Sequence, residues 1–126
     1  MRYTDIQNEA ISRYGIHLDP CSACWGRTHA HIRERRICKW HAKNSAQATF
    51  ELLHEIGHCE TTTARMRRCE AEFYATQWAI DRCREYGVEI PAKTLELYQN
   101  YILREYDRGI RRGGALPPKN RFKLRV

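Results

Sequence analysis

The sequence predicts a mostly helical α+β fold, and three observations lead to that class. Helix-forming residues dominate three long stretches, roughly 44–60, 65–86 and 91–112. Ahead of them, two short segments have the composition and alternation of strands. At 126 residues the chain is long enough for one modest hydrophobic core. We therefore expect a single domain.

The N-terminal part is expected to form one helix, a loop and then a hairpin. Thr4 and Gln7 have the spacing of a capping box, and Gly15 is placed to end the helix that they begin. Residues 28–32 and 35–40 then have the pattern of two short strands joined by a tight turn. This small sheet would precede the long helices.

Capping and helix-breaking residues mark the ends of the three long helices. Asn44, with Gln47 three residues later, has the form of an N-cap. The second helix is expected from about Arg65 to Tyr86, where Gly87 can form its C-cap. Pro91 suits the start of the third.

The first long helix carries an H-E-x-x-H motif, formed by His54, Glu55 and His58. Residues four apart lie on one face of a helix, so both imidazoles can reach one metal ion. Glu55 beside the first ligand could take a proton from an activated water. The plainer alternative is an amphipathic helix in which two histidines share a face by chance.

A catalytic zinc site normally takes three protein ligands. On the second long helix we expect Glu70 as the third ligand, with Glu72 as the alternative. Glu70 could instead be a surface carboxylate that pairs with Arg67 or Arg68. Glu60 is disfavoured because it lies two residues after His58 and would point away from it on a continuing helix.

Two motifs together resemble the ImmA/IrrE family of metallopeptidases: the run 49–58, which ends in H-E-I-G-H, and the segment Glu70-Ala-Glu-Phe-Tyr-Ala75. The resemblance covers roughly residues 28–86. It implies a zincin-like domain in which His54, His58 and Glu70 bind zinc and Glu55 is the general base. The chain departs from the family in its short spacing, with only eleven residues between His58 and Glu70.

The same resemblance implies an activity. Members of this family often come from phages and mobile elements and cleave a cognate transcriptional repressor. The expected function is therefore a zinc-dependent endopeptidase that acts on a specific protein partner. Two alternatives remain open: a non-catalytic metal-containing protein that inhibits or recruits a macromolecule, and a DNA-associated regulator.

A second metal site is also possible near the N-terminus. Cys21 and Cys24, followed after thirteen residues by Cys38 and His41, have the spacing of a C-x2-C…C-x2-H structural zinc site. Buried cysteines that pack as small apolar residues are the alternative. The remaining cysteines lie on the predicted helices, and we expect no disulfides.

The formal charge of +7 is concentrated at one end of the chain. Residues 111–126 hold six of the 22 Lys and Arg residues and no acid, so residues 1–110 are near neutral. With a Gly pair and a Pro pair, this end is expected to be a flexible basic tail, with nucleic-acid contact as its functional interpretation. No apolar run approaches the ~20 residues of a membrane span, and a cytoplasmic location is expected.

Overall fold

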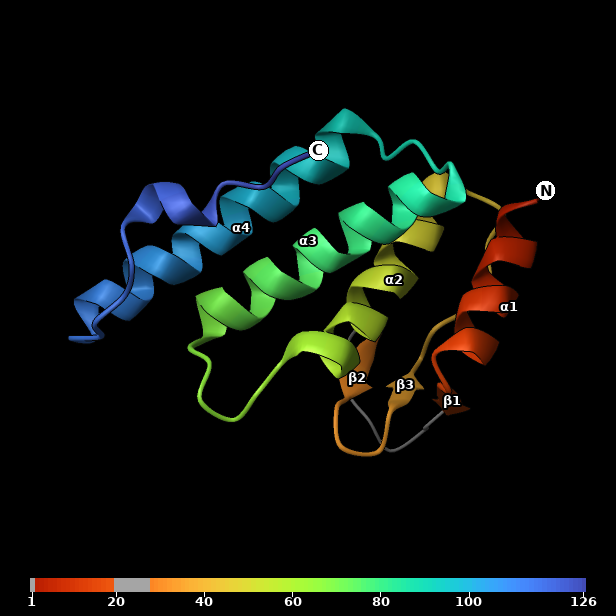
Figure 1. The fold of residues 1–126 in the computed structure, drawn as a ribbon, viewed down its shortest axis with the longest axis horizontal. Helices are drawn as coiled ribbons and strands as arrows, with labels where there is room; N and C mark the ends of the chain where they lie inside the picture. The colour runs from red at the N-terminus through yellow and green to blue at the C-terminus, as the bar shows by residue number, and fades with distance from the viewer. Residues whose placement is uncertain (1, 20–27) are drawn as a thin grey trace.

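The computed structural model of the chain describes residues 2–19 and 28–126. Within them it contains four α-helices, three short strands and one 3-10 helix. In chain order these are α1 (Tyr3–Arg13), β1 (His17–Asp19), β2 (His29–His31), β3 (Arg36–Cys38), α2 (Ala46–Thr61), α3 (Arg68–Tyr86), α4 (Ala92–Arg111) and η1 (Lys119–Phe122). The predicted mixture of helices with a small sheet is confirmed (Figure 1).

The sheet has the strand order β1-β3-β2, in which β2 and β3 form the expected antiparallel hairpin. Strand β1, which was not expected from the sequence, pairs in parallel with β3. Three residues are too few to show a strand period, and the partner of β1 lies about twenty residues further along the chain. Ala30 pairs with Ile37, which is fully buried in the core, so one face of the sheet packs against the helices.

The helix boundaries follow from local capping. Ser45 begins α2, because its Oγ accepts a hydrogen bond from the backbone N–H of Ala48 at 3.1 Å. Asn44, the expected cap, instead accepts one from the backbone N–H of Tyr3 and ties α1 to α2. Gly87 ends α3 in the left-handed conformation, with φ of 72°, as expected of a C-cap glycine.

Helices α2 and α3 lie side by side at the centre of the molecule and approach each other closely (Figure 1). At Gly57, the fourth residue of the H-E-x-x-H motif, the α2 backbone lies very close to that of α3. A Cβ added there would lie 2.6 Å from the carbonyl oxygen of Ala75. Phe50, Leu53 and Ile56 on the same helix are fully buried in the main core. The motif is therefore on a rigid element that is held from several sides.

We expect Gly57→Ala to destabilise the protein by about 1–3 kcal/mol, because the new methyl group forces the α2 and α3 backbones apart. Urea unfolding measures the change. Gly109→Ala in α4 is the matched control, since its Cβ would meet only the mobile end of the Leu116 side chain. In Gly109→Ala, part of the usual gain of about 0.5–1 kcal/mol in stability for alanine over glycine in a helix should remain. Equal effects at both positions would contradict the close approach.

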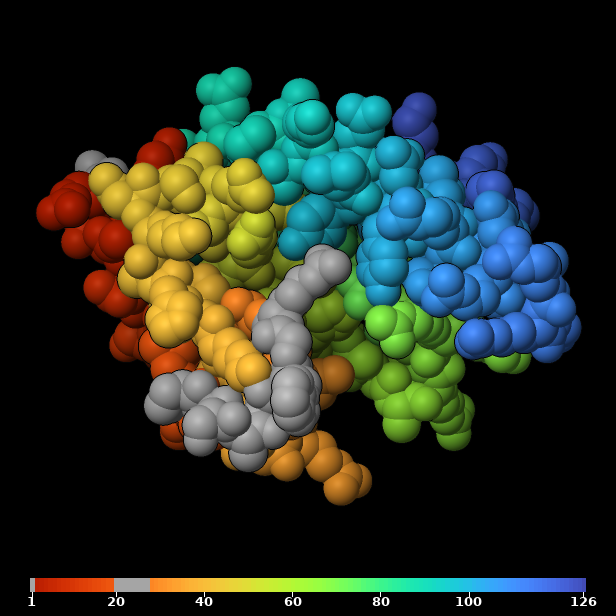
Figure 2. Space-filling view, turned by 180° about the vertical axis from the view of Figure 1, so that it is seen from behind, coloured from red at the N-terminus to blue at the C-terminus, as the bar shows by residue number. Residues whose placement is uncertain are grey.

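The C-terminal segment departs from the expected flexible tail, because it packs along α3 and α4 (Figure 1). Phe122 is buried against Phe73 and Ile102 in a second small core. The side-chain amide of Gln99 binds the backbone of this segment through both of its polar atoms: Nε2 donates to the carbonyl of Phe122, and Oε1 accepts from the N–H of Leu124. Seen from behind, α1 (red) and α4 (blue) lie at opposite sides of the molecule (Figure 2). Composition alone suggested disorder, but one buried aromatic side chain and specific backbone contacts hold this segment.

Candidate metal centre

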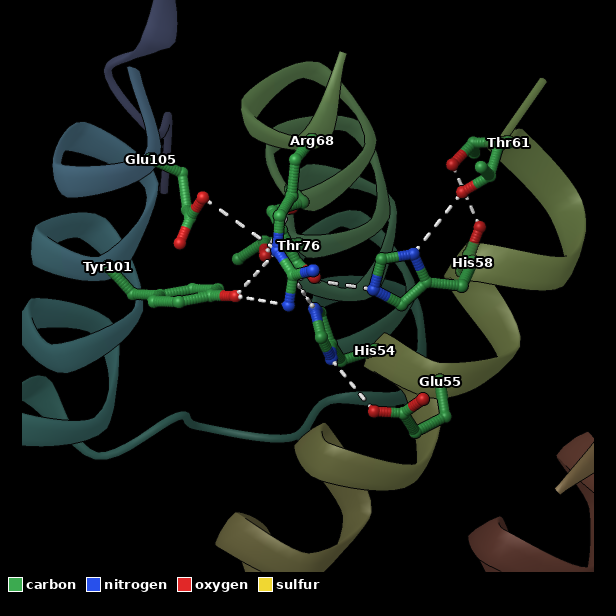
Figure 3. Close-up of polar contacts among 11 residues, drawn as sticks. His54, Glu55, His58, Thr61, Arg68, Thr76, Tyr101 and Glu105 are labelled. Atoms are coloured by element: carbon green, nitrogen blue, oxygen red, sulfur yellow. Dashed lines mark hydrogen bonds and ion pairs between the residues drawn. The ribbon is translucent and has the colours of Figure 1, made fainter. Parts of the chain in front are cut away.

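The two motif histidines lie one helical turn apart on α2, with their ring centroids 4.7 Å apart. His54 is buried, and the edge-to-face contact of its ring with Tyr98 of α4 has a centroid distance of 4.9 Å. The orientation of the His58 ring is fixed by a hydrogen bond, because its Nδ1 lies 3.2 Å from the hydroxyl of Thr62. A hydrogen bond at Nδ1 leaves Nε2 with a lone pair for a metal ion. Figure 3 shows both rings projecting from α2.

Glu72 of α3 completes a group of three. Its Oε2 lies 3.1 Å from Nε2 of His54 and 3.3 Å from Nε2 of His58. Among the described residues, these three side chains offer ligand atoms that all lie within 4.8 Å of one another. Glu72 is mostly shielded from solvent. The structure thus brings together two imidazoles and one carboxylate from two neighbouring helices.

Glu70, the third ligand expected from the sequence, is not in this group. It is the third residue of α3, and its Oε1 accepts a hydrogen bond from the backbone N–H of Arg67 at 3.0 Å. Glu70 therefore caps its own helix. Residues two apart on a helix point about 200° away from each other, so the helix phase that directs Glu72 toward α2 directs Glu70 away. The alternative named from the sequence occupies the place expected of Glu70.

The geometry of the group fits a tetrahedral metal ion. Ligand atoms about 2.1 Å from such an ion are separated from one another by about 3.4 Å. The two distances from Glu72 to the histidines, 3.1 and 3.3 Å, are close to that value. Two neutral imidazoles and a carboxylate are also ligands that suit zinc.

The histidines and carboxylates of the group shift one another's pKa values. Burial by itself lowers the pKa of His54, but the neighbouring carboxylates of Glu55 and Glu72 outweigh it and raise that pKa to about 9. Burial likewise favours the neutral acid of Glu72, yet the two histidines beside it, His54 and His58, hold its pKa well below the usual range. Both shifts reflect the mutual attraction of histidine rings and carboxylates in a poorly hydrated site, which favours the charged form of each group.

Glu55 lies on the other side of the His54 ring. Its Oε1 is 3.5 Å from Nδ1 of His54, an ion-pair distance without the geometry of a good hydrogen bond. Glu55 and His54 line a pocket of about 600 Å³ that extends between α2 and α4. The carboxylate expected to be the general base is therefore accessible from this pocket.

Helix α4 adds side chains to the site that the sequence analysis did not single out. Tyr101 lines the same pocket, and its hydroxyl accepts hydrogen bonds from Nε and Nη2 of Arg68 at 3.2 and 3.1 Å. The buried carboxylate of Glu105, on the same helix as Tyr101, lies 3.7 Å from Nε of Arg68 (Figure 3). No sequence signal distinguished Tyr101 from the other tyrosines of α4, because its role depends on contact with another helix.

The residues predicted for a structural zinc site are only partly placed. Cys21 and Cys24 lie outside the described residues. Cys38 is fully buried, and among the described residues its sulfur lies close to ring nitrogens of His29 and His31. His41 is exposed and is not part of this group. The remaining cysteines, Cys59, Cys69 and Cys83, are free thiols on α2 and α3, as expected.

Comparison with protein-family models, with curated proteins and with solved structures finds no significant match to this chain. No helix among the described residues has both the length and the apolar character that a membrane span requires. Functional inference therefore depends on the side chains at the site.

Proposed function

We propose that the chain is a zinc-dependent endopeptidase that cleaves a specific protein partner. The observation that carries this proposal is the convergence of His54, His58 and Glu72, with ligand atoms within 4.8 Å of one another, beside a pocket that Glu55 also lines. The likeness of residues 49–58 and 70–75 to the ImmA/IrrE motifs adds support, with Glu72 in the ligand role in place of Glu70.

Each residue has a distinct role in this mechanism. His54, His58 and Glu72 would hold the ion, which supplies a Lewis acid for the scissile carbonyl and acidifies a water molecule towards a pKa of ~7. Glu55 takes a proton from the attacking water and delivers it to the departing amine. Tyr98 keeps the His54 ring in place through its edge-to-face contact.

Tyr101 is positioned to stabilise charge on the substrate. Because its hydroxyl accepts hydrogen bonds from Arg68, its own proton remains available for donation into the pocket. The nearby guanidinium adds positive charge on the same side of the site. A developing oxyanion would be stabilised by both groups.

We expect Tyr101→Phe to lower kcat by roughly 10²-fold, with metal content unchanged, because one donor to the oxyanion is lost. Steady-state kinetics on a cleaved peptide measure it. Tyr74→Phe is the matched control, since Tyr74 is exposed on α3 and does not line the pocket. A rise in KM with kcat intact would instead assign Tyr101 to substrate binding.

The chemistry of the pocket indicates a polypeptide substrate. It combines acidic side chains (Glu51 and Glu55), one basic side chain (Arg104) and apolar surface from Leu97 and Tyr98. Such a mixture suits an extended peptide with side chains of several kinds. A transcriptional repressor of a phage or mobile element is the partner class that the family resemblance implies.

The proposal is tested with a library of unstructured peptides. The zinc-loaded protein is incubated with the library, and new peptide termini are identified by mass spectrometry. We expect cleavage that a chelator abolishes, that added Zn²⁺ restores and that His54→Ala lacks. If the wild type produces no termini beyond those of the His54→Ala variant, and also fails to cleave co-expressed candidate repressors, the endopeptidase proposal is wrong.

A further inference from the structure

A second group of side chains of the metal-binding types lies on the small sheet and shares no residue with the H-E-x-x-H group. Neighbouring residues of a strand point to opposite faces. Because Ile37 and its partner Ala30 face the core, Cys38 of β3 and His29 of β2 face the other way. His29 and Cys38 are directly paired across the two strands, and His31 shares the face of His29.

These three side chains are close enough to share one ion. An imidazole nitrogen from each histidine and the Cys38 sulfur all lie within 4.8 Å of one another. The two imidazole rings are in edge-to-face contact, with their centroids 5.0 Å apart. Cys38 is fully buried although it faces away from the core, and both histidines are partly buried. A thiolate with two imidazoles is a donor set that favours zinc over the harder cations Mg²⁺ and Ca²⁺.

The backbone around Cys38 is held in an unusual conformation. Lys39 immediately after it has φ of 60°, in the left-handed region that a residue with a side chain seldom adopts. Its carbonyl accepts a hydrogen bond from the hydroxyl of Thr28, and its N–H donates to the carbonyl of Asp19. The neighbours of Cys38 and His29 are therefore tied together at the position where the two side chains meet. This turn sets the direction of the thiol relative to β2.

Strands of three residues need additional stabilisation. Pairing of two short strands is marginal in water, and this sheet contains three such strands. A metal ion bridging β2 and β3 would fasten the hairpin at its open end. Thr28, which precedes His29, also lines the pocket at the H-E-x-x-H site. Fixing the hairpin would therefore also fix one wall of that pocket.

We propose that His29, His31 and Cys38 bind a structural zinc ion, separate from the ion at His54, His58 and Glu72. In this assignment His29 and His31 take the place beside Cys38 that the sequence pattern gave to His41, whereas Cys21 and Cys24 lie outside the described residues. It does not depend on the proposed peptidase activity.

Cobalt substitution tests the site directly. A Co²⁺–thiolate bond gives a near-ultraviolet charge-transfer band, which the His54, His58 and Glu72 site cannot produce because it has no sulfur ligand. We expect the Co²⁺-loaded wild type to show this band, and both Cys38→Ser and His31→Ala to lose it or shift it. His41→Ala and Cys59→Ser are matched controls that should keep it. Loss of the band in His41→Ala with retention in His31→Ala would overturn the assignment.

Metal content separates the two sites. We expect two equivalents of zinc in the wild type, one in His31→Ala and one in His54→Ala, with the thiolate band intact in the Co²⁺-loaded His54→Ala protein. Far-ultraviolet circular dichroism checks that each variant retains its helices. His31→Ala removes a partly exposed side chain, so it remains informative if Cys38→Ser fails to fold. Two equivalents in a folded His31→Ala protein would refute the proposal, whereas absence of peptide cleavage would leave it standing.

Discussion

Glu55→Gln is expected to abolish peptide hydrolysis while leaving the zinc in place. The amide is nearly the same size as the carboxylate but cannot accept a proton from water, so the rate should fall by roughly 10²- to 10⁴-fold. Because Glu55 contacts His54 at Nδ1 and is not part of the ligand group, metal content should not change. Cleavage kinetics and elemental analysis on the same sample measure the two effects separately.

The outcome of this substitution distinguishes the functional alternatives. Glu51→Gln is the matched control, because Glu51 lies one turn earlier on α2 and lines the same pocket. Its kcat should stay within a few-fold of the wild-type value, because Glu51 lines the substrate pocket but takes no part in proton transfer. If Glu55→Gln keeps full hydrolytic activity, the proton-transfer role is excluded. If it loses hydrolysis but still acts on its partner in cells, the chain works as a metal-containing binding protein.

The second large effect concerns the third ligand. Glu72→Gln is expected to weaken zinc binding at the H-E-x-x-H site strongly, because it removes a ligand. Loss of a group that only contacts a ligand costs about 10- to 100-fold in affinity, and the effect here should be larger. Glu70→Gln should leave the affinity unchanged, because Glu70 caps α3 at the Arg67 backbone. A competition titration with a chromophoric chelator measures both.

Thermal unfolding provides an independent measurement of the same assignment. A ligand that binds only the folded state raises its stability in proportion to the logarithm of its concentration over Kd. Added zinc should therefore raise the Tm of the wild type and of Glu70→Gln, with a smaller rise for Glu72→Gln. His31→Ala can serve as the background, so that the sheet site does not contribute. The reverse order of the two Glu variants would restore Glu70 as the ligand.

The pair His54 and His58, with Glu55 between them, could be predicted from the sequence because their relation is local. A helix places residues four apart on one face whatever surrounds it. The hairpin and the C-cap at Gly87 were predictable for the same reason, since turn and cap preferences act within a few residues. For these features, the order of residues is nearly sufficient.

Tertiary structure decided the rest. Whether Glu70 or Glu72 reaches the histidines depends on which face α3 turns toward α2. The contact of Gly57 with Ala75 determines how closely the two helices approach. Tyr101 reaches Arg68 only because α4 packs on α3. His29, His31 and Cys38 meet only through strand register. Sequence spacing determines which side chains share a face of one element, whereas packing between elements determines which faces meet.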